Sequence, residues 1–166
     1  MAAAPRTEAM TRSATLSTCR QYRFELWRRW GHGAYAMFIG LNPSTADETA
    51  DDPTIRRCVG FARAWGYDAM CMTNLFAYRA TLPADMKKAA DPVGWEVNDR
   101  RLRHLAAEAG VVIAAWGAHG AFMDRGANVR RMLPGGLHYL RLTKDGHPGH
   151  PLYLPASLQP VEWTAW

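Results

Sequence analysis

The sequence predicts an α/β fold, a three-layer sandwich in which a mostly parallel sheet of about four strands carries an antiparallel edge. Two observations predict it. Short apolar runs alternate with longer segments of helical periodicity, and that order implies right-handed crossovers between parallel strands. The chain has 166 residues, of which 48% are hydrophobic and 21% are charged. Both values suit one globular domain with a substantial core.

The predicted sheet begins with two strands near the amino end. Residues 21–30 (QYRFELWRRW) alternate apolar and charged side chains, which is the period of a half-exposed strand. Gly31-His32-Gly33 offers a turn, and residues 34–41 (AYAMFIGL) have the apolar run of a buried strand. We therefore expect a hairpin that joins an edge strand to a central one. Residues 1–14 lack the apolar run of a signal peptide, and we expect them to be a disordered tail before a single domain over 15–166.

Asp52 and Pro53 predict the start of the first helix. Aspartate accepts hydrogen bonds from the free N–H groups of a first turn, and proline suits the first helical position. The helix is expected to run to about Trp65 and to stop at Gly66. Beyond it, the same criteria predict strands over 69–75, 111–116 and 137–142, a helical turn over 83–90, and helices over 95–109 and 121–133.

Charge and cysteine content narrow the classes of function. The formal net charge is +5 and the isoelectric point is near 9.4, so polyanions suit the protein as partners. Cys19, Cys58 and Cys71 form no CxxC pair, which argues against a zinc ribbon or a four-cysteine iron–sulfur cluster. An odd cysteine count without a secretory signal fits a reducing cytoplasm. We expect a cytoplasmic protein with no cofactor, no metal and no membrane partner.

Glycines and polar residues follow each predicted parallel strand. In open α/β sheets the ligand binds outside the carboxyl ends of the strands. Those ends carry Gly40 to Ser44, Thr73-Asn74, Trp116 to Gly120, and Lys144 to Leu152. Four such ends in one sheet predict a ligand site at that edge.

The same segments resemble two protein families. Phe38 to Ser44 (FIGLNPS) is similar to the first motif of the uracil-DNA glycosylase superfamily, in its mismatch-specific branch, and His150-Pro151-Leu152 is similar to its last motif. The intervening strings TNLFAYR and VVIAAWG resemble its second and third strands, in the same order, across roughly residues 34–154. At finer grain the strings LNPSTAD, NLFAYRAT and GHPGHPLYL resemble a bacterial and phage family, the domain of unknown function 1643 family.

The glycosylase resemblance implies a glycosylase-like fold and a role for each matching residue. Asn42 would position a water, Asn74 would pair with the edge of a base, and His150 would donate to the base oxygen. Leu152 would wedge into a base stack, and Phe61, Phe76 or Trp116 would stack on the base. The remaining residues expected to contact the substrate are Leu41, Pro43, Ser44, Arg79, Gly117 and His147.

Departures from the glycosylase pattern leave three functions open. His147 is an extra histidine, and the loop after Asn42 is acidic, with Asp47, Asp51 and Asp52. Acids beside a DNA path repel phosphates, so they favour a small ligand or a chemical role, and Asp47 is a candidate catalytic acid. The leading hypothesis is N-glycosidic bond hydrolysis on DNA or a modified nucleotide. The alternatives are a non-catalytic nucleic-acid or nucleotide-binding module and a metal-dependent nucleotide hydrolase that uses the acidic loop.

Several of these residues also have a purely structural interpretation. Asn42, Pro43 and Ser44 can form a turn and a cap, and Asp52 can serve only as the cap of its helix. The amide of Asn74 can satisfy neighbouring backbone groups. His119 lies in a glycine-flanked turn, where we expect a structural role.

Overall fold

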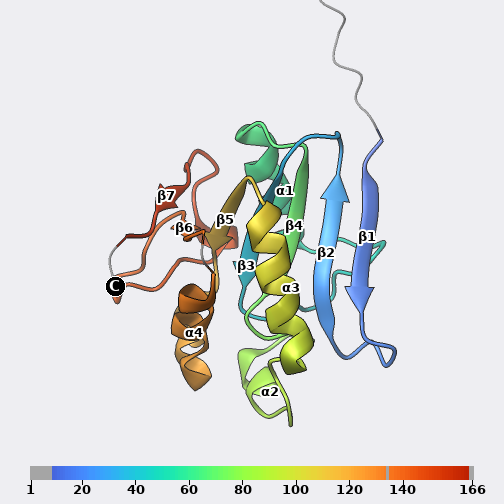
Figure 1. The fold of residues 1–166 in the computed structure, drawn as a ribbon, viewed down its shortest axis with the longest axis vertical. Coiled ribbons are helices and arrows are strands. Elements are labelled where there is room, and N and C mark those ends of the chain that lie inside the picture. Colours follow the sequence, from blue (N-terminus) through green and yellow to red (C-terminus); the bar gives the residue numbers. More distant parts are fainter. Residues whose placement is uncertain (1–8, 134, 165–166) are drawn as a thin grey trace, which may run out of the picture.

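The structure is a computed structural model that describes residues 9–133 and 135–164, and its seven strands form a single sheet (Figure 1). The strands lie in the order β1-β2-β4-β3-β5-β6-β7. Their bounds are Thr11–Leu16 (β1), Arg23–Arg29 (β2), Tyr35–Gly40 (β3), Ala69–Asn74 (β4), Val111–Ala114 (β5), His138–Tyr139 (β6) and Val161–Glu162 (β7). Four α-helices accompany them: Pro53–Ala64 (α1), Pro83–Lys87 (α2), Trp95–Glu108 (α3) and Arg125–Met132 (α4). The fold is mixed α/β, as predicted.

Parallel and antiparallel pairings are equally frequent in this sheet. Strand β3 pairs in parallel with β4 and with β5, and β5 pairs in parallel with β6. The pairs β1–β2, β2–β4 and β6–β7 are antiparallel. A mostly parallel sheet is therefore not confirmed, because antiparallel strands flank the four parallel strands on both sides.

The predicted hairpin between β2 and β3 is wrong, because β4 lies between these two strands. The turn after β2 packs instead on the residue that precedes β4. The backbone N–H groups of Trp30 and Gly31 donate to the carbonyl of Asp68, and Gly33 N–H donates to the Asp68 carboxylate at 2.7 Å. This anchoring directs the chain past β4 before it enters β3.

Strand β1 also corrects the predicted amino-terminal tail. Residues 11–14 belong to β1, whose Thr11 to Leu16 pair with β2. The prediction of a disordered tail is therefore wrong for these four residues, while residues 1–8 lie outside the described part of the chain. An edge strand with exposed polar side chains has little apolar periodicity, so its sequence gives a weak strand signal.

Helix α1 starts and ends as its sequence predicts. Asp52 caps it by accepting a hydrogen bond from Ile55 N–H at 2.9 Å, and Pro53 occupies the first turn. The buried side chains of α1, including Phe61, pack on Phe38 and Met70 from the sheet. The opposite face of the sheet packs against buried residues of α2, α3 and α4. Helices thus cover both faces (Figure 1).

The carboxyl-terminal third is less regular than predicted. In place of one helix over 121–133, a 3-10 helix η1 (Ala118–Asp124) precedes α4, with a break at Met123 and Asp124, whose φ angles are 56° and 54°. The strand predicted over 137–142 is only His138–Tyr139. A second 3-10 helix, η2 (Pro151–Tyr153), and strand β7 follow.

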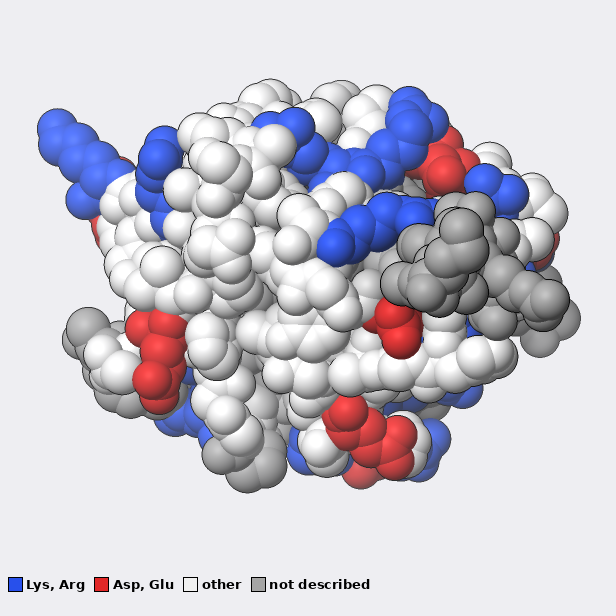
Figure 2. Space-filling view, turned by 90° about the horizontal axis from the view of Figure 1, so that it is seen from above, with Lys and Arg blue, Asp and Glu red and all other residues white. Residues whose placement is uncertain are grey.

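Charge is distributed unevenly at the end of the molecule opposite the carboxyl ends of β3, β4 and β5. There Lys and Arg gather mainly in the upper half of the view and Asp and Glu mainly in the lower half, with uncharged residues over most of the surface (Figure 2). The net charge of +5 therefore does not form one continuous basic face at this end. Within the described residues, no helix is long and apolar enough to cross a membrane.

Candidate functional site

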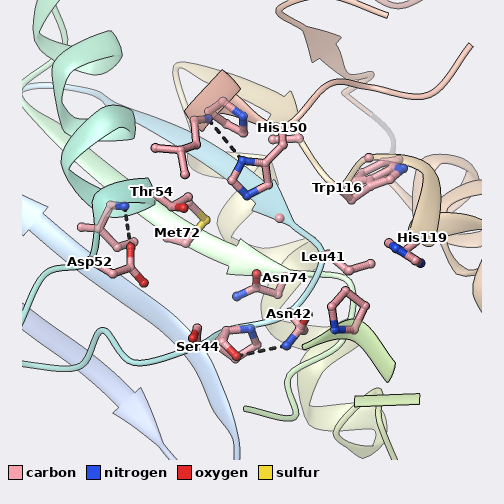
Figure 3. Close-up of a pocket in the computed structure, with 18 of the residues that line it drawn as sticks. Leu41, Asn42, Ser44, Asp52, Thr54, Met72, Asn74, Trp116, His119 and His150 are labelled. Atoms are coloured by element: carbon pink, nitrogen blue, oxygen red, sulfur yellow. Dashed lines mark hydrogen bonds between the residues drawn. The ribbon is translucent and has the colours of Figure 1, made fainter. Parts of the chain in front are cut away.

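A cavity of about 660 Å³ opens at the carboxyl ends of the parallel strands (Figure 3). Its walls come from the ends of β3, β4 and β5, the start of α1, and η2. Its size lies within the range of small-molecule and cofactor pockets. Nine of the residues predicted for the site line it: Leu41, Asn42, Pro43, Ser44, Asn74, Trp116, Gly117, His150 and Leu152.

Asn74 ends β4 with its carboxamide in the cavity (Figure 3). The residue is only 3% exposed, and its Nδ2 has no hydrogen-bond partner among the described residues. Its register partner is Gly40, where an added Cβ would lie 2.8 Å from the Asn74 Oδ1. Glycine at this position therefore leaves room for the amide.

Two buried polar side chains hold the backbone beside Asn74. The Nδ2 of Asn98, on α3, donates to the carbonyls of Asn74 and Leu75 at 3.2 and 3.1 Å. Arg125 Nε donates to the Leu75 carbonyl at 2.9 Å. The main chain of Asn74 is thus fixed by the fold, while its side-chain Nδ2 has no partner among the described residues.

The side-chain nitrogen of Asn42, unlike that of Asn74, is fully hydrogen-bonded within the protein. Its Nδ2 donates to the carbonyls of Ala80 and Pro43, at 2.8 and 3.1 Å. The bond to Ala80 holds two loops together and the bond to Pro43 lies within one of them, so the amide nitrogen is fully used and the oxygen Oδ1 is left to accept a hydrogen bond. An acceptor without a base's proton affinity can orient a water, which is the role that the sequence predicts for Asn42.

His150 precedes η2 and faces the cavity (Figure 3). Its Nδ1 accepts a hydrogen bond from Leu152 N–H at 3.2 Å. An accepting Nδ1 places the proton of a neutral imidazole on Nε2, which makes Nε2 a donor. Burial lowers the pKa of His150, and the nearby Asp52 carboxylate opposes this shift. The neutral donor form is therefore favoured at pH 7.

Two charged residues that the sequence analysis did not assign to the site also line the cavity. Arg23 belongs to β2 and is 3% exposed, although strand alternation puts it on the exposed side with Glu25. Asp52 was interpreted mainly as a helix cap; it caps α1 and also lines the cavity. It supplies the only carboxylate among the described lining residues. The Asp52-Pro53 signal locates the helix start, and its position after the carboxyl end of β3 is the signal that places this start at the edge with the cavity.

The acidic loop has a structural role instead of the predicted chemical one. Asp47 Oδ1 accepts from Thr49 N–H and Ala50 N–H at 2.9 and 2.8 Å, and these bonds lower its pKa to about 2. Asp51 pairs with the fully buried Arg28 at 2.7 Å. Neither carboxylate lines the cavity, so the predicted catalytic role of Asp47 lacks the necessary geometry. No cluster of three metal-ligating side chains occurs in the described ranges.

Four other predicted contacts also lie away from the cavity. Phe61 and Phe76 are 2% and 0% exposed and belong to the two core clusters, so neither ring face is open to a base. Arg79 donates to the carbonyls of Ser44, Thr45 and Arg20 and thereby braces the loop. His147 lies in a turn closed by Thr143, whose N–H donates to the His147 carbonyl and whose hydroxyl accepts from His147 N–H. Conversely, His119, expected to be structural, lines the cavity and lies 3.0 Å from Lys87 Nζ.

Residues 23–152 match the family described as "Protein of unknown function (DUF1643)". The chain belongs to this family. The match covers more than half of the chain, and within it lie Arg23, Asn42, Asn74 and His150. A search of curated proteins and a search of solved structures found no match. The family's description names no activity, so a function has to be argued from the cavity.

Proposed function

We propose that the cavity binds a nucleobase as part of a nucleotide or of DNA, and that the protein hydrolyses its N-glycosidic bond. One observation carries the proposal: the carboxamide of Asn74 lies in the cavity, is 3% exposed, and has no partner for its Nδ2 in the part of the chain that the structure describes. A buried amide left unpaired costs free energy unless a ligand completes it. A carboxamide offers one donor and one acceptor side by side, which complements the edge of a base.

The lining residues suit the two demands of N-glycosidic hydrolysis. Water attacks the sugar carbon, and the electrons of the C–N bond move onto the departing base. The Nε2–H donor of His150 can stabilise the charge on the base, and Asn42 Oδ1 can orient the water. The proton released by the water can pass to Asp52. The resemblance of FIGLNPS and HPL to glycosylase motifs supports the same roles for Asn42 and His150. It also supports a glycosylase-like three-layer fold.

The binding proposal predicts that Asn74→Ala lowers the affinity for a nucleoside and leaves stability unchanged. Affinity for a nucleoside should fall about 5- to 150-fold, because about 1–3 kcal/mol of hydrogen bonding to the base is lost. The free energy of unfolding should change by less than about 0.5 kcal/mol, since no protein partner is lost. Isothermal titration with the deoxyribonucleosides and their monophosphates measures affinity, and urea unfolding measures stability. Asn128→Ala, at an exposed position of α4, is the matched control.

The non-catalytic module remains the second candidate, because the amide of Asn42 cannot take a proton. Asp52→Asn separates the two candidates, since asparagine caps a helix about as well as aspartate. A hydrolase should lose about 10²-fold or more in rate with unchanged stability. Base release is followed on free nucleotides and as abasic-site formation on uracil-containing and mismatched DNA, duplex and single-stranded. Binding without base release from any of these substrates supports the module and rejects the enzyme.

A further inference from the structure

Arg23 is a buried cation with an unused hydrogen-bonding edge. Its Nη1 donates to the carbonyl of Ala46 at 2.9 Å. Its Nε is fully buried, and neither Nε nor Nη2 makes a hydrogen bond to any described residue. The Nε and Nη2 N–H bonds point the same way and form the fork with which arginine grips two oxygens of one oxyanion.

The second buried arginine of β2 gives the contrast. Arg28 is 0% exposed, and its Nε pairs with Asp51 at 2.7 Å while Nη2 donates to the carbonyls of Asp47 and Ala50. Arg23 has no carboxylate within ion-pair distance among the described residues. Leaving a buried guanidinium without a counter-ion is unfavourable, so a polar group from outside the chain is needed to complete it.

The charges around Arg23 favour an anion. Asp52 is the carboxylate that acts on it, while Arg28 and Arg79 are nearby cations. Arg28 is neutralised by Asp51, so Arg23, Arg79 and Asp52 leave a net positive charge. Pro53 and Thr54, in the first turn of the 12-residue helix α1, line the same cavity as Arg23. The positive end of that helix dipole adds to the attraction.

We propose that Arg23 binds the phosphate of a free mononucleotide, through a two-point contact from Nε and Nη2, while Asn74 contacts the base. The inference rests on the proposed function and narrows it, because it makes the substrate a mononucleotide instead of DNA. Arg23 lines the cavity but is only 3% exposed, so its guanidinium has to turn towards the cavity to meet a terminal phosphate that enters it. The phosphodiester of a polymer continues on both sides and has no such freedom to enter.

The first test uses only the wild-type protein. Isothermal titration compares each deoxyribonucleoside with its 5′- and 3′-monophosphate, with inorganic phosphate and with a single-stranded oligonucleotide. A charge-assisted two-point contact should make one monophosphate series bind about 10- to 100-fold more tightly than the nucleosides. Equal affinity of nucleosides and monophosphates overturns the phosphate site. Tighter binding of the oligonucleotide than of every mononucleotide overturns the choice of substrate class.

The second test assigns the preference to Arg23. Arg23→Gln should reduce the monophosphate preference to less than about 3-fold while nucleoside affinity stays within about 3-fold of wild type. Arg56→Gln, at an exposed position in the first turn of α1, removes the same charge and should keep the preference. Circular dichroism checks that both variants fold. If Arg23→Gln does not fold, the comparison of nucleosides and monophosphates with the wild-type protein still tests the phosphate site.

The outcomes distinguish this inference from the proposed function. If nucleosides bind but monophosphates gain nothing, the phosphate site fails and the base site stands. If inorganic phosphate raises the melting temperature of wild type but not of Arg23→Gln, while no nucleoside or nucleotide binds, the base site fails and the anion site stands. If none of these probes binds, both fail.

Discussion

The acidic loop and the cavity wall are adjacent in space and treat polar groups in opposite ways. In the loop, the Asp47 and Asp51 carboxylates meet backbone N–H groups or arginines. In the wall, Asn74 Nδ2 and Arg23 Nε are buried and meet nothing from the described chain. The number of charged residues in the sequence suggested a chemical role for the loop. The structure instead places these two unpaired polar groups in the cavity wall.

This difference separates stabilising polar groups from binding ones. A hydrogen bond made within the protein lowers the free energy of the folded state, and its loss appears in stability. A buried polar group without an internal partner lowers stability, and its energy is recovered only when a ligand binds. Variants in the loop should therefore change stability, and variants in the wall should change affinity.

The largest expected effect comes from the loop's central contact. Arg28→Met should lower the free energy of unfolding by about 3–5 kcal/mol, because it leaves Asp51 and the backbone carbonyls of Trp27, Asp47 and Ala50 without their buried donor. Urea unfolding at pH 7 measures the loss. Arg12→Met, on the neighbouring strand opposite Arg28, changes an exposed residue and should cost less than about 0.5 kcal/mol. A loss below 1 kcal/mol in Arg28→Met would show that the loop does not depend on this arginine.

Gly40→Ala tests the wall without removing a polar group. The new Cβ would lie 2.8 Å from Asn74 Oδ1, so the amide must rotate out of place. Nucleoside affinity should fall about 10-fold, or about 1.4 kcal/mol, while stability changes by less than about 1 kcal/mol. Gly60→Ala in α1 meets nothing within 4 Å and should leave affinity unchanged. Unchanged affinity in Gly40→Ala would mean that the position of the Asn74 amide is irrelevant to the ligand.

Asp47→Asn should have a smaller effect, confined to stability. The pKa of Asp47 is lowered to about 2 by its backbone hydrogen bonds. A lowered carboxyl pKa contributes stability above the unfolded value of about 3.9, and this contribution is lost as the pH falls towards 2. Asparagine keeps the accepting oxygen but loses the charge that strengthens these hydrogen bonds, so the variant should lose about 1 kcal/mol at pH 7 and show a weaker pH dependence between pH 4 and 2. A loss of base-release activity at unchanged stability would restore Asp47 as a catalytic candidate.

The smallest expected effect concerns His150. Burial lowers its folded pKa below the unfolded value of about 6.5, so the folded state binds fewer protons. Its contribution to stability is therefore present above pH 6.5 and declines as the pH falls through the folded pKa. His150→Gln should flatten the stability profile between pH 7 and 5. Asp52→Asn should shift the wild-type decline to lower pH, because the Asp52 charge raises the His150 pKa.

Local features of the fold were predictable from the sequence, and pairing across distance was not. The cap at Asp52, the strand that ends at Gly40 and the strand that ends at Asn74 depend on nearby residues, and each prediction is confirmed. The neighbour of β2 depends on where the turn after β2 packs. Trp30 N–H donates to the Asp68 carbonyl, and the Trp30 indole N–H donates to the Tyr67 carbonyl, 37 residues along the chain. No local pattern encodes that contact.

The site was predictable to a similar degree. Residues at strand ends were found, because sheet topology brings those ends together. Arg23 was missed because simple alternation along β2 groups it with Glu25, which contacts Arg101 of α3. The register shift of the β1–β2 ladder between Thr15 and Leu16 breaks that alternation, and Arg23 contacts the carbonyl of Ala46 in the loop that Arg28 also contacts. Phe61 and Phe76 were chosen for their aromatic rings, but ring type does not distinguish a stacking surface from a core contact.

The rim of the cavity, formed by residues 151–153 of η2, allows the ligand preference of the protein to change without a change in its fold. Leu152 and Tyr153 line the cavity but are 37% and 81% exposed, whereas Pro151 beside them is buried. Arg57 holds η2 through the backbone carbonyl of Leu154, and Gly117 N–H donates to the Pro148 carbonyl at 2.8 Å. Because main-chain bonds fix this rim, its two exposed side chains are free to vary at little cost in folding. Selection, in nature or in a library randomised at these two positions, can therefore retune the ligand while the inner wall stays constant.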